Sequence, residues 1–213
     1  MAQTLKEEAR QAIIEAAKEE FLEKGYKGAS MRSIAKKSHM TVGNLYRYFK
    51  SKEDINLYIV APTFKEIDNA LKSLTKGNVS METRVFNIKP SVKDLNAMLD
   101  ELSDCMVNVY YNHKTEFNIL MLHSRLSEDL INWFAGIIDS IISENFLMEG
   151  LKNDKDVLAR AYAESICAGI RALFRDADSE LEILKILLKT YFHSFISMIS
   201  NDIKGFNNGI YSI

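Results

Sequence analysis

Residues 30–54 read SMRSIAKKSHMTVGNLYRYFKSKED, and this stretch decides the fold of the N-terminal part of the chain. It predicts two short helices joined by a tight turn and followed by the start of a third helix. Ser30, Thr41 and Ser51 can each begin a helix, because a hydroxyl at that position accepts a hydrogen bond from an unpaired amide of the first turn.

The second of these helices has one apolar face. Val42, Leu45 and Phe49 follow a spacing of i, i+3 and i+7, which places them on one buried face and leaves polar residues on the other. Glu53 and Asp54 lie in the first turn of the third helix, where the helix dipole favours negative charge. This layout is that of a helix-turn-helix whose second helix enters the major groove of DNA.

The same stretch is strongly cationic. Between Gly25 and Lys52 there is no Asp or Glu, and the cations are Lys27, Arg32, Lys36, Lys37, Arg47, Lys50 and Lys52. Cations near phosphates release condensed counterions, so such a segment suits a polyanion. A solvated basic face on an ordinary helical protein is the alternative, and the coincidence of charge with helix-turn-helix spacing favours DNA. On the preceding helix, Lys6 or Arg10 can approach a phosphate, although plain solvation is the interpretation we favour.

Three motifs in this stretch together carry a family resemblance. They are Ile-Ala at 34–35, Leu-Tyr-x-Tyr-Phe at 45–49 and Ser-Lys-Glu-Asp at 51–54, and their combination resembles the DNA-binding domain of the tetracycline-repressor-like (TetR) family. The resemblance implies an all-α fold. It has an N-terminal three-helix helix-turn-helix domain over residues 1–54 and a larger C-terminal helical domain, for effector binding and dimerisation, over residues 55–213. The family commonly has Gly in the turn, and here the left-handed position falls near His39.

The resemblance also implies which residues meet double-stranded DNA. Gly43 permits close approach of the backbone, and Asn44 hydrogen-bonds a base such as adenine. Tyr48 and Lys52 hold the phosphate backbone, whereas Arg47 is open between base and phosphate. The full expected set is Arg32, Thr41, Val42, Gly43, Asn44, Tyr46, Arg47, Tyr48 and Lys52.

Composition and charge distribution agree with a basic head on an acidic body. Residues 1–52 hold 11 Lys and Arg against 6 Asp and Glu, and the remaining residues hold 16 against 23. Only the head is therefore expected to meet nucleic acid. No apolar run approaches the roughly 18 residues of a membrane helix and the N-terminus lacks a signal pattern, so we expect a cytoplasmic protein without a membrane partner. Cys105 and Cys167 are expected to be free thiols.

Apolar periodicity predicts helices along the whole chain. One spans 5–24 and another 52–74, with a kink or break near 60–61 because Pro62 removes a backbone hydrogen bond; whether Pro62 is a hinge or a static bend is open. The connection 75–91 can hold a short turn or strand at 84–88, or be mobile. Further helices are expected to open at Ser91, to span 115–123, to open at Ser127, and to span 155–175 and 181–199, with fraying from Asn201.

The last two long helices are the expected dimer interface. One side of helix 155–175 carries small residues, and helix 181–199 is apolar over more than half its circumference, more than one core-facing stripe needs. In the family these helices pair with their mates as a four-helix bundle, and a fully buried monomer core is the alternative. The expected interface residues are Ala161, Ser165, Ala168, Gly169, Ala172, Leu184, Leu188, Tyr191 and Phe195.

The family resemblance further implies a small-molecule effector in the C-terminal domain. Met and aromatic side chains suit an apolar or aromatic ligand, although such residues are usually ordinary core. The candidates are Met98, Cys105, Met106, Tyr110, Met121, Trp133, Phe134 and Tyr162. His113, Glu116 and His123 have the side chains of a metal site, but polar connecting segments usually solvate such residues, so no metal or cofactor is expected.

These observations predict a ligand-responsive transcriptional regulator. We expect a repressor that binds a palindromic operator as a homodimer and is released by a small apolar or aromatic effector. An architectural DNA-binding protein without ligand control is the alternative. An all-helical enzyme is a third possibility, for which the sequence offers no Gly-rich phosphate loop and no nucleophile–base pairing.

Overall fold

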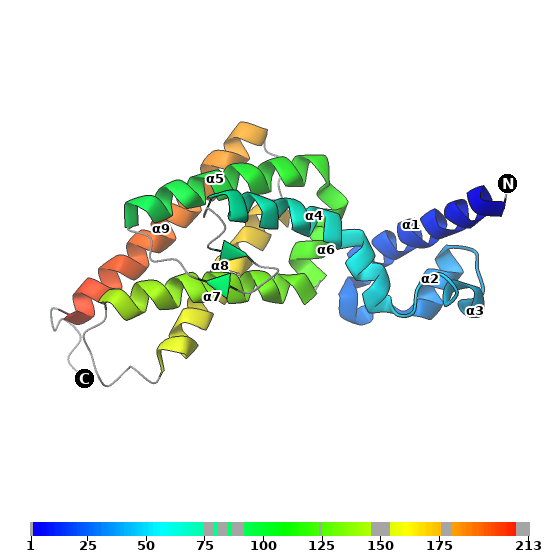
Figure 1. Ribbon diagram of the computed structural model, residues 1–213, viewed down its shortest axis with the longest axis horizontal. Coiled ribbons are helices and arrows are strands. Elements are labelled where there is room, and N and C mark those ends of the chain that lie inside the picture. The colour runs from blue at the N-terminus through cyan, green and yellow to red at the C-terminus, as the bar shows by residue number, and fades with distance from the viewer. Residues whose placement is uncertain are drawn as a thin grey trace. The chain divides into compact units, whose positions relative to one another are not determined.

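The computed structural model describes residues 2–74, 79–80, 85–86, 92–123, 125–145, 154–175 and 180–207. The fold is all-α, as predicted, with one two-residue hairpin (Figure 1). The elements are α1 (Ala2–Gly28), α2 (Met31–Lys37), α3 (Val42–Leu45), α4 (Lys52–Leu74), β1 (Val79–Ser80), β2 (Val85–Phe86), α5 (Val92–Asn112), α6 (Lys114–His123), α7 (Arg125–Asn145), α8 (Lys155–Arg175) and α9 (Leu181–Asn207).

The helix bounds follow the sequence pattern closely, with differences at the ends of α1, α7 and α9; α1 spans Ala2–Gly28 instead of 5–24. The predicted spans of α4 and α8 are confirmed, and the antiparallel pair of β1 and β2 falls in the connection where a short strand was predicted. Helix α7 begins at Arg125 instead of Ser127, and α9 continues to Asn207 instead of fraying from Asn201.

Helix α4 runs through Pro62 as one helix, so of the predicted kink or break the break is wrong, and the kink stays a prediction. Pro62 and Tyr58 are both exposed, whereas Ile59 and Thr63 are buried on the opposite side of the helix. Water can therefore hydrate the Tyr58 carbonyl that loses its partner, and the helix continues.

The chain forms two compact units. Unit 1 comprises Met1–Lys65 and Asn112–Ser127, and unit 2 comprises Glu66–Tyr111 and Glu128–Ile213. Unit 1 therefore contains the helix-turn-helix together with α6, a segment that lies between α5 and α7 in the sequence. The division of function at residue 54 remains a prediction, since compactness alone does not assign a role to either side.

Unit 1 is built around the apolar face of α1. Ile13, Ala17 and Phe21 are fully buried, and the chain leaves the helical path at Gly25, whose φ of 69° is readily adopted by a residue without Cβ. The ring of Tyr26 then packs on Phe21 with centroids 5.9 Å apart.

Helix α6 packs on α1 within the same unit. Phe117 and Ile119 of α6 are fully buried. At the edge of this contact the Lys18 ammonium lies 2.7 Å from the Glu116 carboxylate, so an ion pair ties α6 to α1.

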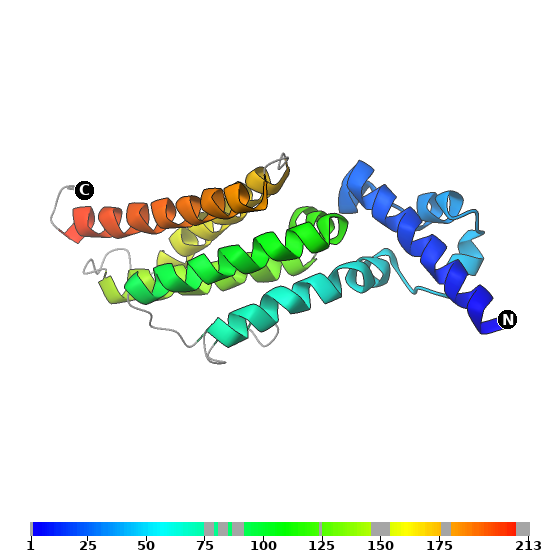
Figure 2. The ribbon, with the colours of Figure 1, turned by 90° about the horizontal axis from the view of Figure 1, so that it is seen from above.

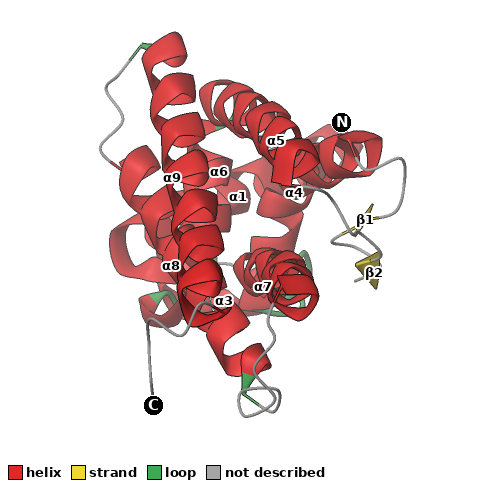
Figure 3. Cartoon of the chain, turned by 90° about the vertical axis from the view of Figure 1, so that its left-hand side faces the viewer, coloured by secondary structure: helices red, strands yellow, loops and turns green. Residues whose placement is uncertain are grey.

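Unit 2 contains α5, α7, α8 and α9, which lie side by side in Figure 2. In Figure 3 α7 is seen closest to end-on, whereas α8 and α9 run obliquely across the view. Its largest fully buried side chains are Trp133, Phe174 and Phe192. Helix α9 is tied to α5 by the Lys189–Asp104 ion pair at 2.8 Å. Against α8, the Tyr191 hydroxyl donates a 2.9 Å hydrogen bond to the Ser165 carbonyl.

Gly169 of α8 makes that last contact possible, and its replacement tests the α8–α9 packing. A Cβ added at Gly169 would overlap the phenol ring of Tyr191. We therefore expect Gly169→Ala to lower the free energy of unfolding by about 1–3 kcal/mol, the usual cost of overpacking. Urea unfolding followed by the fluorescence of Trp133, the single Trp of the chain, measures this in unit 2.

The matched control is Gly43→Ala, because a Cβ added there meets no atom within 4 Å. This variant should leave the Trp133 transition unchanged. Wild-type unfolding of Gly169→Ala would contradict the packing described here.

Candidate nucleic-acid interface

All three predicted helix caps of the helix-turn-helix are present. The Ser30 hydroxyl accepts a hydrogen bond from the Ser33 amide at 3.1 Å, and the Thr41 hydroxyl accepts one from the Asn44 amide at 3.2 Å. The Ser51 hydroxyl likewise accepts from the amide of Asp54 at 3.1 Å. These local bonds fix where α2, α3 and α4 begin.

The turn between α2 and α3 is held in the strained conformation that the sequence predicts. His39 has a φ of 54°, in the left-handed region. The following amide, that of Met40, donates to the Ala35 carbonyl at 2.8 Å, and the buried Ser38 hydroxyl donates to the Ile34 carbonyl at 2.9 Å. The turn is therefore closed by hydrogen bonds on both sides of His39.

Helix α3 is short and presents its polar face to solvent. Leu45 is fully buried, and Phe49, just beyond the helix, is 2% exposed. Val42 is only half-buried, so the prediction that it shares their buried face is corrected. Its position at the first turn leaves it at the rim of the core. The polar side then consists of exposed Thr41, Gly43, Tyr46 and Arg47, with half-buried Asn44 and Tyr48.

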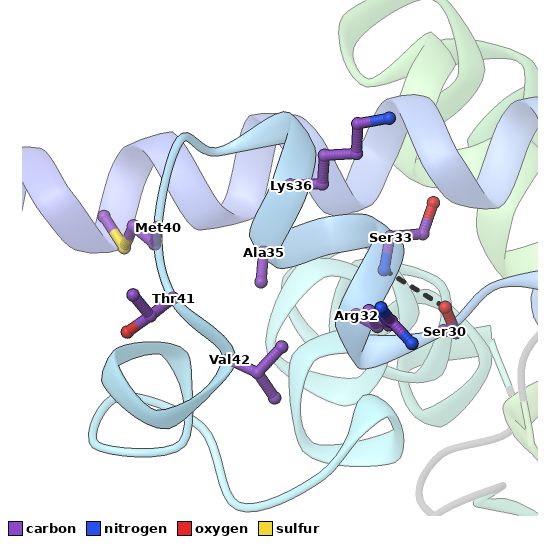
Figure 4. A pocket seen from close by; sticks show the side chains of 8 residues that line it. All are labelled: Ser30, Arg32, Ser33, Ala35, Lys36, Met40, Thr41 and Val42. Atoms are coloured by element: carbon purple, nitrogen blue, oxygen red, sulfur yellow. Dashed lines mark hydrogen bonds between the residues drawn. The ribbon is translucent and has the colours of Figure 1, made fainter.

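An open groove of about 560 Å³ lies between α2 and the start of α3. Figure 4 shows Ala35 and Val42 pointing into it, with Arg32 beside them, whereas Lys36 extends away. Its lining combines apolar, hydroxyl and cationic side chains: Ser30, Arg32, Ser33, Ala35, Lys36, Met40, Thr41 and Val42. Such a lining can contact sugar, methyl and phosphate groups.

Two of the seven cations between Gly25 and Lys52 make ion pairs or hydrogen bonds within unit 1. The Lys37 ammonium lies between three carboxylates of α1, at 2.7 Å from Glu23, 3.1 Å from Glu19 and 3.4 Å from Glu20. The Lys52 ammonium donates to the carbonyl of Tyr26 at 2.5 Å and to that of Ala29 at 2.8 Å. Lys37 thus fastens α2 to α1, and Lys52 fastens α4 to the end of α1.

The carboxylate at the centre of the Lys37 cluster is buried. Glu20 is 0% exposed and also accepts from the Lys24 ammonium at 2.7 Å. Burial by itself raises the pKa of Glu20, but hydrogen bonds from Lys24, Ser33 and Lys37 outweigh it and hold the pKa below its usual value. The stability that this cluster contributes is present at neutral pH and is lost as the pH falls through the lowered pKa.

The other five cations are available to a ligand. Their charged groups make no ion pair or hydrogen bond within the part of the chain that the structure describes. They are Lys27, Arg32, Lys36, Arg47 and Lys50, and all are exposed. Sequence counting alone overestimated the free cations, because the partners of Lys37 and Lys52 lie on another helix.

Lys6 belongs to the same surface, although the sequence favoured plain solvation for it. A second groove, of about 380 Å³, is lined by Leu5, Lys6, Arg47 and Tyr48. Arg10 is elsewhere engaged, with its guanidinium 5.5 Å from the ring centroid of Phe49 and 5.8 Å from that of Tyr58. No local sequence signal separates these two cations, since only packing decides which one faces outward.

The effector candidates divide between the two units. Met121 lies in unit 1, and the other seven lie in unit 2. Cys105 and Tyr162 are half-buried, and burial raises the pKa of the Cys105 thiol. The remaining five are buried: Met98, Met106, Tyr110, Trp133 and Phe134.

Among the buried effector candidates, Trp133 has a side-chain N–H without a hydrogen-bond partner among the described residues. The side chain is 0% exposed and packs edge-on against Phe134, with ring centroids 4.7 Å apart. Its indole N–H has no hydrogen-bond acceptor among the described residues. A buried donor without an acceptor costs roughly 1–3 kcal/mol, so a bound group that supplies an acceptor would be stabilised here.

Several expected interface residues are instead used inside unit 2. Leu184 and Leu188 are 1% and 0% exposed within the single chain, so both side chains pack in the core of unit 2. Tyr191 packs over Gly169 and bonds the Ser165 carbonyl of its own chain. The small residues of α8 therefore admit a ring from α9, while Ala161, Ala168 and Ala172 are exposed and Phe195 is half-buried.

The exposed apolar residues of α9 are not the ones that the sequence predicts at the dimer interface. Ile183, Ile186, Leu187 and Met198 are 48%, 63%, 42% and 43% exposed. On α8, Val157 is 70% exposed. The described helices include none that is both long and apolar enough to cross a membrane.

Comparison with known proteins places the helix-turn-helix among bacterial regulators. Residues 13–59 match the family model of bacterial regulatory proteins, tetR family. The uncharacterised HTH-type transcriptional regulator YdgC of Bacillus subtilis (strain 168) is 26% identical over 173 residues, which cover 71% of this chain and 88% of that protein. The HTH-type transcriptional repressor KstR of Rhodococcus jostii (strain RHA1) is 32% identical over 73 residues, 34% of each chain.

A solved structure extends the likeness to the fold. The TetR-like transcriptional regulator from Rhodococcus sp. RHA1 matches with a TM-score of 0.50 and 16% identity, over 86% of this chain and 92% of that chain. At this identity the match concerns the arrangement of helices.

Lys36 and Lys37 are neighbours with opposite environments, and they provide a matched test. Lys37→Ala removes a cation that holds three carboxylates, so we expect a lower midpoint of urea unfolding. Lys36→Ala should unfold like the parent but lower the slope of log K against log salt by about one on a random-sequence duplex, because one phosphate contact is lost. Equal effects of the two variants in both measurements would contradict this assignment.

Proposed function

Because this chain belongs to the tetR family of bacterial regulatory proteins, we propose that it is a ligand-responsive transcriptional repressor. It binds a palindromic operator as a homodimer and is released by a small apolar or aromatic effector. The observation that carries the proposal is the exposed polar face of α3, bordered by five cations without partners among the described residues. The relative from Rhodococcus jostii is itself named a repressor, which supports the direction of control.

The first residues of α3 read the bases. Asn44 donates and accepts at an adenine edge in the major groove, and Gly43, with open space around it, lets the backbone come close. Thr41 and Val42 lie beside them at the open groove between α2 and α3. An apolar Val42 side chain at this point suits a thymine methyl or a sugar.

Phosphate contacts hold the register. Arg32 on α2 and Arg47 after α3 are exposed cations, and Tyr46 and Tyr48 bring hydroxyl groups. Lys52 combines two roles. Its ammonium has three donors, of which two bond the Tyr26 and Ala29 carbonyls, so one donor remains for a phosphate.

Dimerisation uses the exposed apolar side of α9. Family members bind DNA and dimerise, and a single recognition helix reads too few base pairs to select an operator. Ile183, Ile186 and Leu187 are large, apolar and exposed on one helix, which is typical of a surface that a partner covers. A second copy of this chain covers it through a two-fold contact. The proposed contact also includes the exposed alanines of α8, Ala161, Ala168 and Ala172.

Effector binding involves the aromatic core of unit 2. Trp133, Phe134 and Phe192 pack in series, with centroid separations of 4.7 and 5.9 Å. The buried indole N–H of Trp133 favours an effector that carries an acceptor oxygen on an otherwise apolar or aromatic body. Adaptable Met98 and Met106 can reshape around such a body.

Selection of genomic fragments with the purified protein at physiological salt, followed by footprinting, tests the DNA-binding proposal. We expect one palindrome, protected as two half-sites whose centres are about one helical turn apart or a multiple of it. Retention of fragments without a common sequence would replace the repressor with an architectural protein that binds through its charge alone.

Asn44→Ala is the variant that examines base reading in the same assay. It should change the selected sequence at one position of each half-site, with a cost of about 1–3 kcal/mol on the parent operator. Uniform weakening on all sequences would exclude a base contact by Asn44.

Pairs of compounds that differ in one acceptor oxygen examine the effector. Benzophenone and diphenylmethane have nearly the same shape, and only the ketone can accept from the Trp133 N–H. We expect such a ketone to release a labelled operator at roughly tenfold lower concentration than its hydrocarbon, and Trp133→Phe to abolish the difference. If the ketone still releases the operator at a lower concentration than the hydrocarbon in Trp133→Phe, a donor other than Trp133 binds the ketone oxygen.

A further inference from the structure

A groove between the start of α1 and the segment after α3 places two residues without a role in the proposal above, Leu5 and Lys6, beside Arg47 and Tyr48. Its volume is about 380 Å³, and its lining comes from residues far apart in sequence: Leu5 and Lys6 on α1, and Arg47 and Tyr48 after α3. Two cations and a phenol hydroxyl therefore line one opening. Neither Lys6 nor Arg47 forms an ion pair within the described ranges, so both charges are available.

The position of Lys6 is fixed by a contact one helical turn further along α1. Arg10, at i+4 from Lys6, lies over the rings of Phe49 and Tyr58 at 5.5 and 5.8 Å. Phe49 is buried and follows directly after Tyr48. The first turns of α1 are thereby held against the segment that follows α3, and Lys6 is presented on the same side as Arg47.

Leu5 adds a second feature to this groove. It is 64% exposed, a high value for a large apolar side chain, and it lies directly beside two cations. An inorganic anion or an acidic side chain offers nothing to such a residue. A nucleic-acid backbone does, because each phosphodiester is flanked by deoxyribose rings with apolar faces.

We infer that Lys6, Arg47 and Tyr48 together hold one phosphodiester of the operator backbone, outside the bases read by α3, with Leu5 against the adjacent deoxyribose. The inference rests on the proposed function and extends its DNA contact to the first turns of α1. A recognition helix in the major groove has a phosphate strand at each border, and we assign this groove, whose Arg47 and Tyr48 follow α3, to one of the two strands.

Methylphosphonate scanning of the selected operator tests this inference. Each substitution replaces one charged phosphate oxygen with a methyl group. In the parent protein we expect one position per half-site, outside the bases that Asn44 reads, to weaken binding about fivefold. In Lys6→Gln the unmodified operator should already bind about fivefold less tightly, with a salt slope lower by about one per bound chain, and methylation at that position should cost nothing further.

Two further variants separate this contact from general electrostatics. Lys6→Arg keeps the charge and should restore the sensitivity at that phosphate. Lys27→Gln removes another exposed cation of α1 without a described partner and should leave that sensitivity intact. Lys6→Gln that binds like the parent, or that weakens binding without coupling to any single phosphate, would overturn the inference. Since either result is obtained on a footprinted operator, it would leave the proposed function standing.

Discussion

The buried carboxylate of Glu20 and the ammonium of Lys37 form the contact on which the DNA-binding unit depends. Glu20 is 0% exposed on α1, and Lys37, on the last turn of α2, lies 3.4 Å from it and closer still to Glu19 and Glu23. A buried charge must be compensated, so α2 has one favourable placement on α1. The closed turn at His39 then carries that placement to α3, the helix that carries the proposed base-reading side chains.

The same packing determines which cations have partners within the chain and which remain exposed. Lys37 and Lys52 hold helices together, and Arg10 is stacked on aromatic rings, so none of these three acts simply as a surface charge. Arg32, Lys36, Arg47 and Lys6 remain outside, around α2, α3 and the start of α1. The attraction to DNA is therefore concentrated where α3 is exposed, and this concentration favours one docking orientation.

Unit 2 divides its apolar residues between a core and a surface. Leu184 and Leu188 fill the unit's own core, whereas Ile183, Ile186 and Leu187 remain on the outside of the same helix. A helix with two apolar sides can pack in the chain's own core on one side and form the proposed dimer contact on the other. Within that core the Trp133 N–H has no acceptor among the described residues, which gives the proposed effector site a polar group in an apolar setting.

The sequence by itself determined the helices of this protein. The caps at Ser30, Thr41 and Ser51, the left-handed His39, and the limits of α4 and α8 all follow from interactions between residues within about four positions, which a pattern records directly.

The tertiary structure decided which surfaces those helices bury. The Lys37–Glu23 pair spans 14 residues and the bond from Lys52 to Tyr26 spans 26. Packing between distant segments decides three further features in the same way. Leu184 is buried while Ile183 is exposed, α6 belongs to unit 1, and Lys6 lines the same groove as Arg47. No local pattern encodes such partners, because each requires the whole arrangement of helices to bring two distant side chains together.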